Sequence, residues 1–102
     1  MTLESTITKN IMNMAKREGW DPRKYHGNSF TVAGTPDIFC LRESHCVWLE
    51  VKQPGKHPTK IQQHQMKVLS TGPAGTPCFV VHSVEEAKEA LEHAWSIVKD
   101  QS

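Results

Sequence analysis

Two runs of β-prone residues around a short polar turn constrain the fold of this chain most strongly. Residues 37–41 (DIFCL) and 46–52 (CVWLEVK) are mostly apolar, and residues 42–45 (RESH) between them are polar. This pattern predicts a β-hairpin. With the turn at 42–45, the pairing places Asp37 directly opposite Glu50, so both side chains point to the same face of the sheet.

The remaining segments alternate between helical and extended patterns. Apolar residues recur at helical spacing near both ends of the chain, and Ser83-x-x-Glu86 is a capping box. The predicted order is α-β-β-β-α-β-α, with helices at 2–18, about 59–70 and from 83 onward, strands at 29–33, 37–41, 46–52 and 77–82, and a loop at 20–28. Because a helix separates the last two strands, we expect them to be parallel.

Length and composition limit the class of protein. A chain of 102 residues with 37% apolar residues is expected to form one domain, residues 1–102. No apolar run approaches the ~20 residues that a membrane span needs. The polar start lacks the pattern of a signal peptide, and three cysteines without a C-x-x-C pair argue against a disulfide framework. These features predict a cytoplasmic protein.

Charge is distributed unevenly along the sequence. Residues 1–70 contain ten Lys and Arg against six Asp and Glu, whereas residues 71–102 contain two against five. A basic front half fits a face that meets a polyanion, although an ordinary solvated surface can segregate charge in the same way. The basic residues considered for phosphate contact are Lys24 and His26 in the first loop and Lys56, His57 and Lys60 in the loop before the second predicted helix.

The two opposed carboxylates need a compensating partner. Lys52 projects from the same face as Glu50, because side chains alternate along a strand. Two like charges in an apolar sheet can share a proton, which raises one pKa, or bind a divalent cation. Mg²⁺ accepts a couple of carboxylates and keeps several waters. A plain ion pair between Lys52 and Glu50 is the alternative.

Pro36-Asp37 followed by Glu50-Val51-Lys52 is the PD-(D/E)xK nuclease signature. The wider pattern resembles the VRR-NUC (virus-type replication–repair nuclease) branch of that superfamily. Its marks here are Glu4-Ser5, Lys24-Tyr25-His26-Gly27, Gly34-Thr35-Pro36-Asp37-Ile38 and Pro58-Thr59-Lys60-Ile61-Gln62. The resemblance implies a restriction-endonuclease-like core, with a mixed four-stranded sheet flanked by helices.

The resemblance also assigns roles to residues. Asp37 and Glu50 would bind Mg²⁺ or Mn²⁺ through their side chains and Val51 through its carbonyl, with Glu4 completing the acidic cluster directly or through water. Glu4 also fits the first turn of a helix for electrostatic reasons alone.

Two further residues complete the implied site. Lys52 would orient or help to deprotonate the attacking water. Gln62 would hold the site together from the following helix, although a core hydrogen bond is another reading and Gln65 is a second candidate.

The function implied by the resemblance is metal-dependent hydrolysis of DNA. Stand-alone VRR-NUC domains are often phage-encoded homodimers associated with Holliday-junction cleavage, which predicts a structure-selective endonuclease in DNA repair. A flap or single-strand nuclease is the alternative enzyme. A catalytically silent DNA-binding module of the same fold is the alternative outside the enzyme class, and the presence of Asp37, Glu50 and Lys52 favours an active enzyme.

Overall fold

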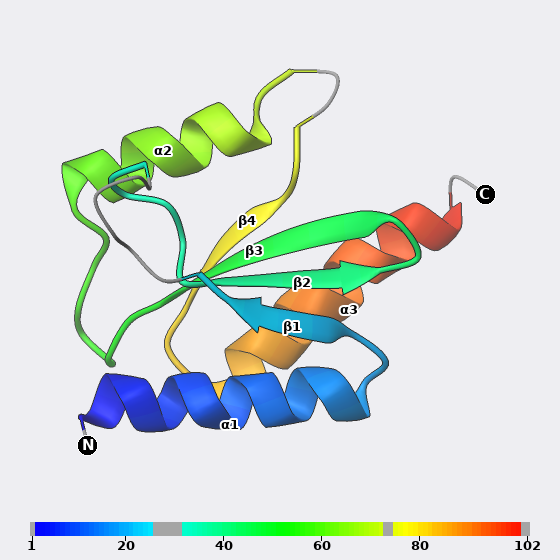
Figure 1. The fold of residues 1–102 in the computed structure, drawn as a ribbon, viewed down its shortest axis with the longest axis horizontal. Coiled ribbons are helices and arrows are strands. Elements are labelled where there is room, and N and C mark those ends of the chain that lie inside the picture. Colours follow the sequence, from blue (N-terminus) through cyan, green and yellow to red (C-terminus); the bar gives the residue numbers. More distant parts are fainter. Residues whose placement is uncertain (1, 26–31, 73–74, 101–102) are drawn as a thin grey trace.

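The computed structural model describes residues 2–25, 32–72 and 75–100. Three helices and four strands follow in the predicted order α-β-β-β-α-β-α (Figure 1). Their bounds are α1 Leu3–Arg17, β1 Asp21–Lys24, β2 Ile38–Arg42, β3 His45–Val51, α2 Lys60–Ser70, β4 Cys78–Val81 and α3 Val84–Asp100. Among these helices, none is long and apolar enough to cross a membrane.

The strands form one mixed sheet in the order β1-β2-β3-β4. The register of the hairpin is the predicted one, because Phe39 pairs with Trp48 and Leu41 with Cys46. β4 returns parallel to β3, as the intervening helix predicts. The end of the hairpin remote from its turn therefore brings the segments around residues 37 and 50 together.

The first strand is not where the sequence predicts it. Asp21–Lys24 was expected to be part of a loop but forms β1 and pairs antiparallel with β2. This edge strand has a neighbour on one side only, so it tolerates Pro22 and needs few apolar side chains. Of the strand predicted at 29–33, residues 29–31 lie outside the described residues, and residues 32–33 do not lie in a strand.

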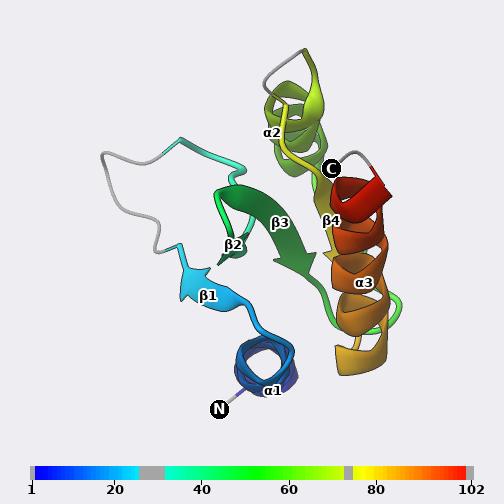
Figure 2. The same cartoon turned by 90° about the vertical axis from the view of Figure 1, so that its right-hand side faces the viewer.

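α1 and α3 pack against each other and against one face of the sheet (Figure 2). Alternate strand residues point into this layer, as the period of a β-strand requires. The buried apolar side chains are Ile11, Met14 and Ala15 of α1, Trp20, Ile38, Cys40, Val47, Leu49, Val51 and Val81 in or beside the sheet, and Ala87, Ala90, Leu91 and Ala94 of α3. This core packs against one face of the hairpin.

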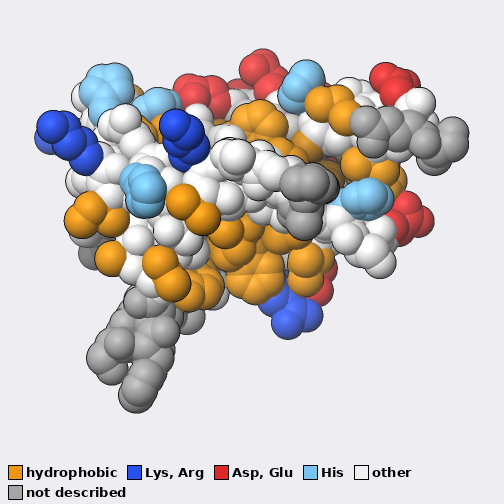
Figure 3. All heavy atoms as spheres, turned by 90° about the horizontal axis from the view of Figure 1, so that it is seen from above, with side chains coloured by type: hydrophobic (Ala, Val, Ile, Leu, Met, Phe, Trp, Pro, Cys, Tyr) orange, Lys and Arg blue, Asp and Glu red, His pale blue; other side chains and the backbone are white. Residues whose placement is uncertain are grey.

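The opposite face of the sheet is only partly covered. Trp48 lies there with the rings of Phe39 and Tyr25 at centroid distances of 5.2 and 6.0 Å. α2 has no buried residue, and its Ile61 and Val68 side chains are 60% and 55% exposed. Hydrophobic side chains gather in the middle of the face seen in Figure 3, which is the side from which α2 projects in Figure 1.

Gly34 brings the loop before β2 against α2. Its φ is +84°, which an L side chain rarely adopts. A Cβ added there would lie 2.6 Å from the carbonyl oxygen of Ile61. The close approach therefore requires glycine and fixes the first turn of α2 beside the segment that carries Asp37.

Candidate active site

Asp37 and Glu50 meet at the end of the hairpin remote from its turn, as the register predicts. Asp37 immediately precedes β2, and Glu50 is the second-last residue of β3, at the end of the strand farthest from the hairpin turn. The Val51 amide donates a hydrogen bond of 2.9 Å to Oδ2 of Asp37. This bond fixes the Asp37 carboxylate beside the β3 backbone, one residue from Glu50.

Glu50 is a buried acid with one satisfied oxygen. The residue is 1% exposed. Its Oε2 accepts a hydrogen bond of 3.0 Å from Nε2 of Gln62 and lies 3.4 Å from Nζ of Lys52. Its Oε1 is buried and has no hydrogen-bond partner among the described residues. A buried, unpartnered carboxylate oxygen is costly to keep unless something binds it.

The pKa values of both carboxyls reflect this environment. Burial, and next the negative charge of Asp37, raise the pKa of Glu50 to about 7, against the opposing effect of Lys52. Burial also raises the pKa of Asp37, while the Val51 amide and then the charges of Lys52 and Lys24 oppose it. Both groups would be stabilised in their charged forms by an added cation.

A cleft of about 300 Å³ opens beside Asp37. Its lining residues are Thr2, Glu4, Ser5, Thr8, Lys24, Asp37 and Gln53. Glu4 therefore faces the cleft from the first turn of α1, and its charge contributes to the raised pKa of Glu50. Glu4 lies on the cleft side of the helix, and its position does more than complement the helix dipole.

Gln62 is held by the cap of its own helix. Its side-chain Oε1 accepts a hydrogen bond of 2.8 Å from the backbone N–H of Thr59, and Oγ1 of Thr59 accepts one from the backbone N–H of Gln62. These bonds form a capping box at the start of α2. With Oε1 engaged, Nε2 is directed at Glu50, so Gln62, and not Gln65, contacts the buried carboxylate.

The donors present fit a hard divalent cation. Asp37 and Glu50 supply carboxylate oxygens, one of them unpartnered, and Mg²⁺ typically binds through one or two carboxylates and waters. In the described part of the chain, no three Asp, Glu, His or Cys side chains are grouped closely enough to hold a metal ion. Glu4 therefore does not form a preassembled three-acid cluster with the other two.

Of the residues predicted to contact DNA, the structure places Lys24 at the cleft but not Lys56 or Lys60. Lys24 is exposed on β1 and lines the cleft, and its charge partly opposes the rise that burial causes in the pKa of Asp37. His26 lies outside the described residues. Lys56 and Lys60 are exposed and do not line the cleft, although the Lys56 carbonyl interacts with Nε2 of His82 at 3.0 Å.

Several cleft residues were not predicted from the sequence. Gln53 follows Lys52 directly, and Thr2, Ser5 and Thr8 recur every third residue at the start of α1. That hydroxyl spacing on an acidic first turn is a signal that could have been used. Gln53 carries no such signal, because its placement depends on the bend of the chain after β3.

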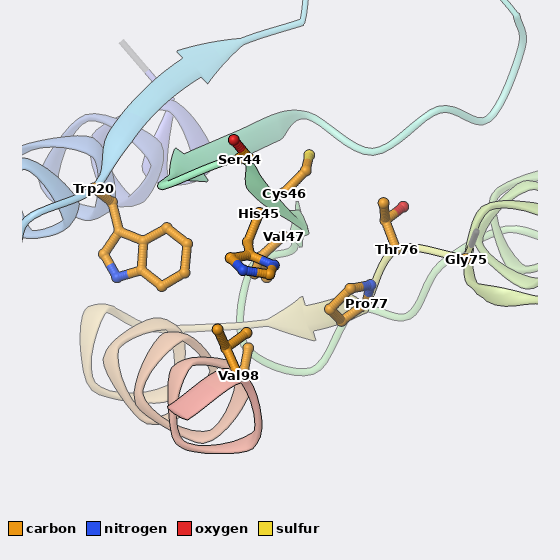
Figure 4. A pocket seen from close by; sticks show the side chains of 10 residues that line it. Trp20, Ser44, His45, Cys46, Val47, Gly75, Thr76, Pro77 and Val98 are labelled. Atoms are coloured by element: carbon orange, nitrogen blue, oxygen red, sulfur yellow. The ribbon is translucent and has the colours of Figure 1, made fainter. Parts of the chain in front are cut away.

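A second pocket, of about 260 Å³, lies at the turn end of the hairpin (Figure 4). The side chains of Trp20, His45, Pro77 and Val98 surround it. Within residues 2–25, 32–72 and 75–100, no carboxylate lines it. It lacks the acids that metal-assisted hydrolysis needs, and the described acids Asp37 and Glu50 lie at the opposite end of the hairpin.

Comparisons with known proteins agree with this architecture. No family model matches the sequence, and no curated protein matches it. Among solved structures, one described as "VRR_NUC domain" has a TM-score of 0.75 and 23% sequence identity, covering 91% of this chain and 98% of its own. Another, a "VRR_NUC domain protein", has a TM-score of 0.68 and 16% identity, covering 92% and 88%. These likenesses confirm the predicted fold, which this chain shares with the two VRR_NUC domain structures.

Proposed function

We propose that this chain, which has the fold of VRR_NUC domains, is a divalent-metal-dependent DNA endonuclease that hydrolyses phosphodiester bonds. The observation that carries the proposal is the buried Glu50 carboxylate, with one unpartnered oxygen, beside Asp37 and Lys52. A carboxylate in that state is suited to binding a cation. The adjoining cleft gives a substrate access to Asp37.

Mg²⁺ or Mn²⁺ would be held by side-chain oxygens of Asp37 and Glu50 and by the Val51 carbonyl, with Glu4 acting through water. When bound, such an ion lowers the pKa of a water ligand and stabilises charge on phosphoryl oxygens. The Val51 amide positions Asp37, since it donates to Oδ2. The protein thereby presents Glu50 from β3 and Asp37 from the position just before β2.

Lys52 and Gln62 support the acids in different ways. Lys52 has a side chain that is 16% exposed and an ammonium 3.4 Å from Glu50, so it can orient the attacking water and stabilise developing negative charge. Gln62 is a positioning residue, because it acts through Glu50 and is itself held by Thr59. The capping box restricts the rotamer of Gln62 and hence the orientation of Glu50.

Metal binding tests the site separately from cleavage. Calorimetry with Mn²⁺ should show binding in the wild type that Asp37→Ala and Glu50→Ala abolish. Glu89→Gln, an exposed acid on α3, is the matched control and should bind as the wild type does. Lys52→Ala should retain metal binding but lose cleavage. Unchanged Mn²⁺ binding in both acid variants would refute the proposed metal site.

The preferred DNA is proposed to be branched, such as a Holliday junction. A panel of junction, flap, splayed-arm, duplex and single-stranded DNA with Mg²⁺, Mn²⁺ or chelator tests this. Preferential cleavage of the junction supports the proposal, while preferential cleavage of flaps or single strands favours the alternative enzyme. Tight DNA binding without cleavage under any metal condition would instead identify a silent binding module. Three further statements stay predictions: that the protein acts in the cytoplasm, that it takes part in DNA repair, and that a phage encodes it.

We also infer that the protein acts as a homodimer. The partly exposed aromatic cluster around Trp48 and the exposed Ile61 and Val68 of α2 offer apolar surface on one side of the molecule. Two symmetry-related sites could cut two strands of a junction. Sedimentation should give a dimer mass that Ile61→Lys combined with Val68→Lys converts to a monomer mass. A wild-type monomer at micromolar concentration would contradict the inference.

A further inference from the structure

The cleft beside Asp37 continues along the outer side of α1. A second hollow of about 240 Å³ shares Ser5, Thr8 and Lys24 with the cleft. It extends toward the C-terminal end of α1, past Asn13 and Lys16. The two hollows therefore form one groove that leads away from the proposed metal-binding acids.

The groove exists because of how α1 meets the edge of the sheet. The helix buries Thr8, Ile11, Met14 and Ala15 against the core. The outward positions Ser5, Lys9, Asn13 and Lys16 recur at intervals of three or four and lie along one side of the helix. β1 is an edge strand that lies beside α1 (Figure 1). Lys24 at the end of β1 lines the groove together with residues of α1.

The chemistry of the groove favours an anionic ligand. Lys9, Lys16 and Lys24 line its outer part, and none of the described acidic residues does. All three are exposed, and none has a salt bridge within the described residues, whereas Lys88 pairs with Glu18 and Lys52 with Glu50. Unpaired cations of one sign in a concave surface attract a polyanion.

The polar groups between the lysines are mostly engaged already. The Thr8 hydroxyl donates to the Glu4 carbonyl at 2.9 Å, and the Ser5 hydroxyl donates to the Thr2 carbonyl at 2.9 Å. The ammonium groups and the Asn13 side-chain amide are therefore the donors in the groove that make no hydrogen bond to another described residue. Contacts of this kind hold phosphates without reading bases.

We propose that one DNA strand flanking the cleaved bond lies in this groove, with its phosphates bound by Lys9, Lys16 and Lys24. The inference rests on the proposed nuclease function and names the surface that its substrate follows. Lys9 and Lys16 are seven residues apart, or roughly 10 Å along the helix, which matches the rise of about three base-pair steps along the axis of B-DNA. Lys24 lines both hollows of the groove and binds the phosphate nearest the acids.

The test is the salt dependence of DNA binding in chelator, where no metal-dependent cleavage occurs. Lys9→Gln combined with Lys16→Gln should lower the slope of log affinity against log salt by roughly 1.5, because each lost phosphate contact removes about 0.7–0.9. The affinity deficit of the variant should shrink about eightfold between about 50 and about 200 mM salt. Oligonucleotides of different sequence should lose affinity equally.

A matched double variant controls for net charge. Lys67→Gln combined with Lys99→Gln removes the same charge from α2 and the end of α3 and should leave the slope unchanged. All substituted side chains are exposed, and thermal melting verifies that both variants fold. Three results would refute the inference that DNA lies in the groove. The salt slope could change equally in both double variants, it could stay unchanged in the Lys9/Lys16 variant, or the wild type could bind no DNA.

A cleavage assay with Mg²⁺ or Mn²⁺ on the same proteins, set beside the binding measurements, separates this inference from the proposed function. If the wild type cleaves DNA but the salt slope of the Lys9/Lys16 double variant is unchanged, the inference that DNA lies in the groove is refuted and the nuclease proposal is not. If the wild type never cleaves DNA but the salt slope falls only in the Lys9/Lys16 double variant, DNA binding in the groove is supported and the nuclease proposal is refuted.

Discussion

The raised pKa of Glu50 predicts a pH-dependent stability that a single substitution removes. The pKa of this buried acid rises from 4.5 to about 7, first because of burial and then because of Asp37. Between those values the folded protein retains a proton that the unfolded chain has lost. The free energy of unfolding therefore falls as the pH rises through this window and levels off above about 7.

The size of the effect follows from the shift. One pKa unit corresponds to about 1.36 kcal/mol, so metal-free wild type should lose on the order of 3 kcal/mol between about pH 4.5 and about pH 8. Glu50→Gln has nearly the shape of the protonated acid and cannot ionise. The variant should match the wild type in stability near pH 4.5 and exceed it near pH 8.

The assay is urea unfolding in chelator at several pH values. Glu89→Gln is the control for loss of an exposed acid and should follow the wild-type curve. His82, whose pKa is raised by its contact with Glu86, also lowers stability as the pH rises, but it is present in all three proteins. Mn²⁺ should stabilise the wild type near pH 8 and leave Glu50→Gln little changed. Parallel pH curves for wild type and Glu50→Gln would refute the reasoning.

Three other substitutions test the surroundings of the site. Gly34→Ala should destabilise the protein by about 1–3 kcal/mol in urea unfolding, because its Cβ would meet the Ile61 carbonyl and its φ is positive; an unchanged midpoint would contradict this. Gln62→Leu should cost about 1–3 kcal/mol near pH 8, less near pH 4.5, and should slow cleavage, because the charged Glu50 loses its amide donor; equal costs at both pH values would point to the helix cap instead. Leu91→Ala, at a position 1% exposed, should cost about 2–5 kcal/mol without changing Mn²⁺ affinity in the folded protein, as calorimetry can check.

The hairpin and its site could be read from the sequence because a short turn fixes a constant register. Once residues 42–45 form the turn, the positions of Asp37 and Glu50 follow from alternation alone. The structure agrees, with Phe39 opposite Trp48. The choice between Gln62 and Gln65 could not be made in this way, because it depends on the hydrogen bond from Thr59 that orients Gln62.

β1 and the groove could not be read from the sequence. Asp21–Lys24 contains Pro, Arg and Lys, which are typical of loops, and it becomes a strand only because β2 offers a free edge. The same tertiary pairing carries Lys24 to the side of α1. Lys9 and Lys16 read as solvated residues until that neighbour is in place.

The Gln62 side chain makes the order of α2 a condition for the order of the site. α2 has eleven residues and none is buried, and isolated helices of that length are marginal in water. Fraying of its first turn would break the Thr59 bond and release the amide that holds Glu50, while the sheet stays folded. A ligand that rigidifies α2 would then sharpen the geometry of an acid it never touches.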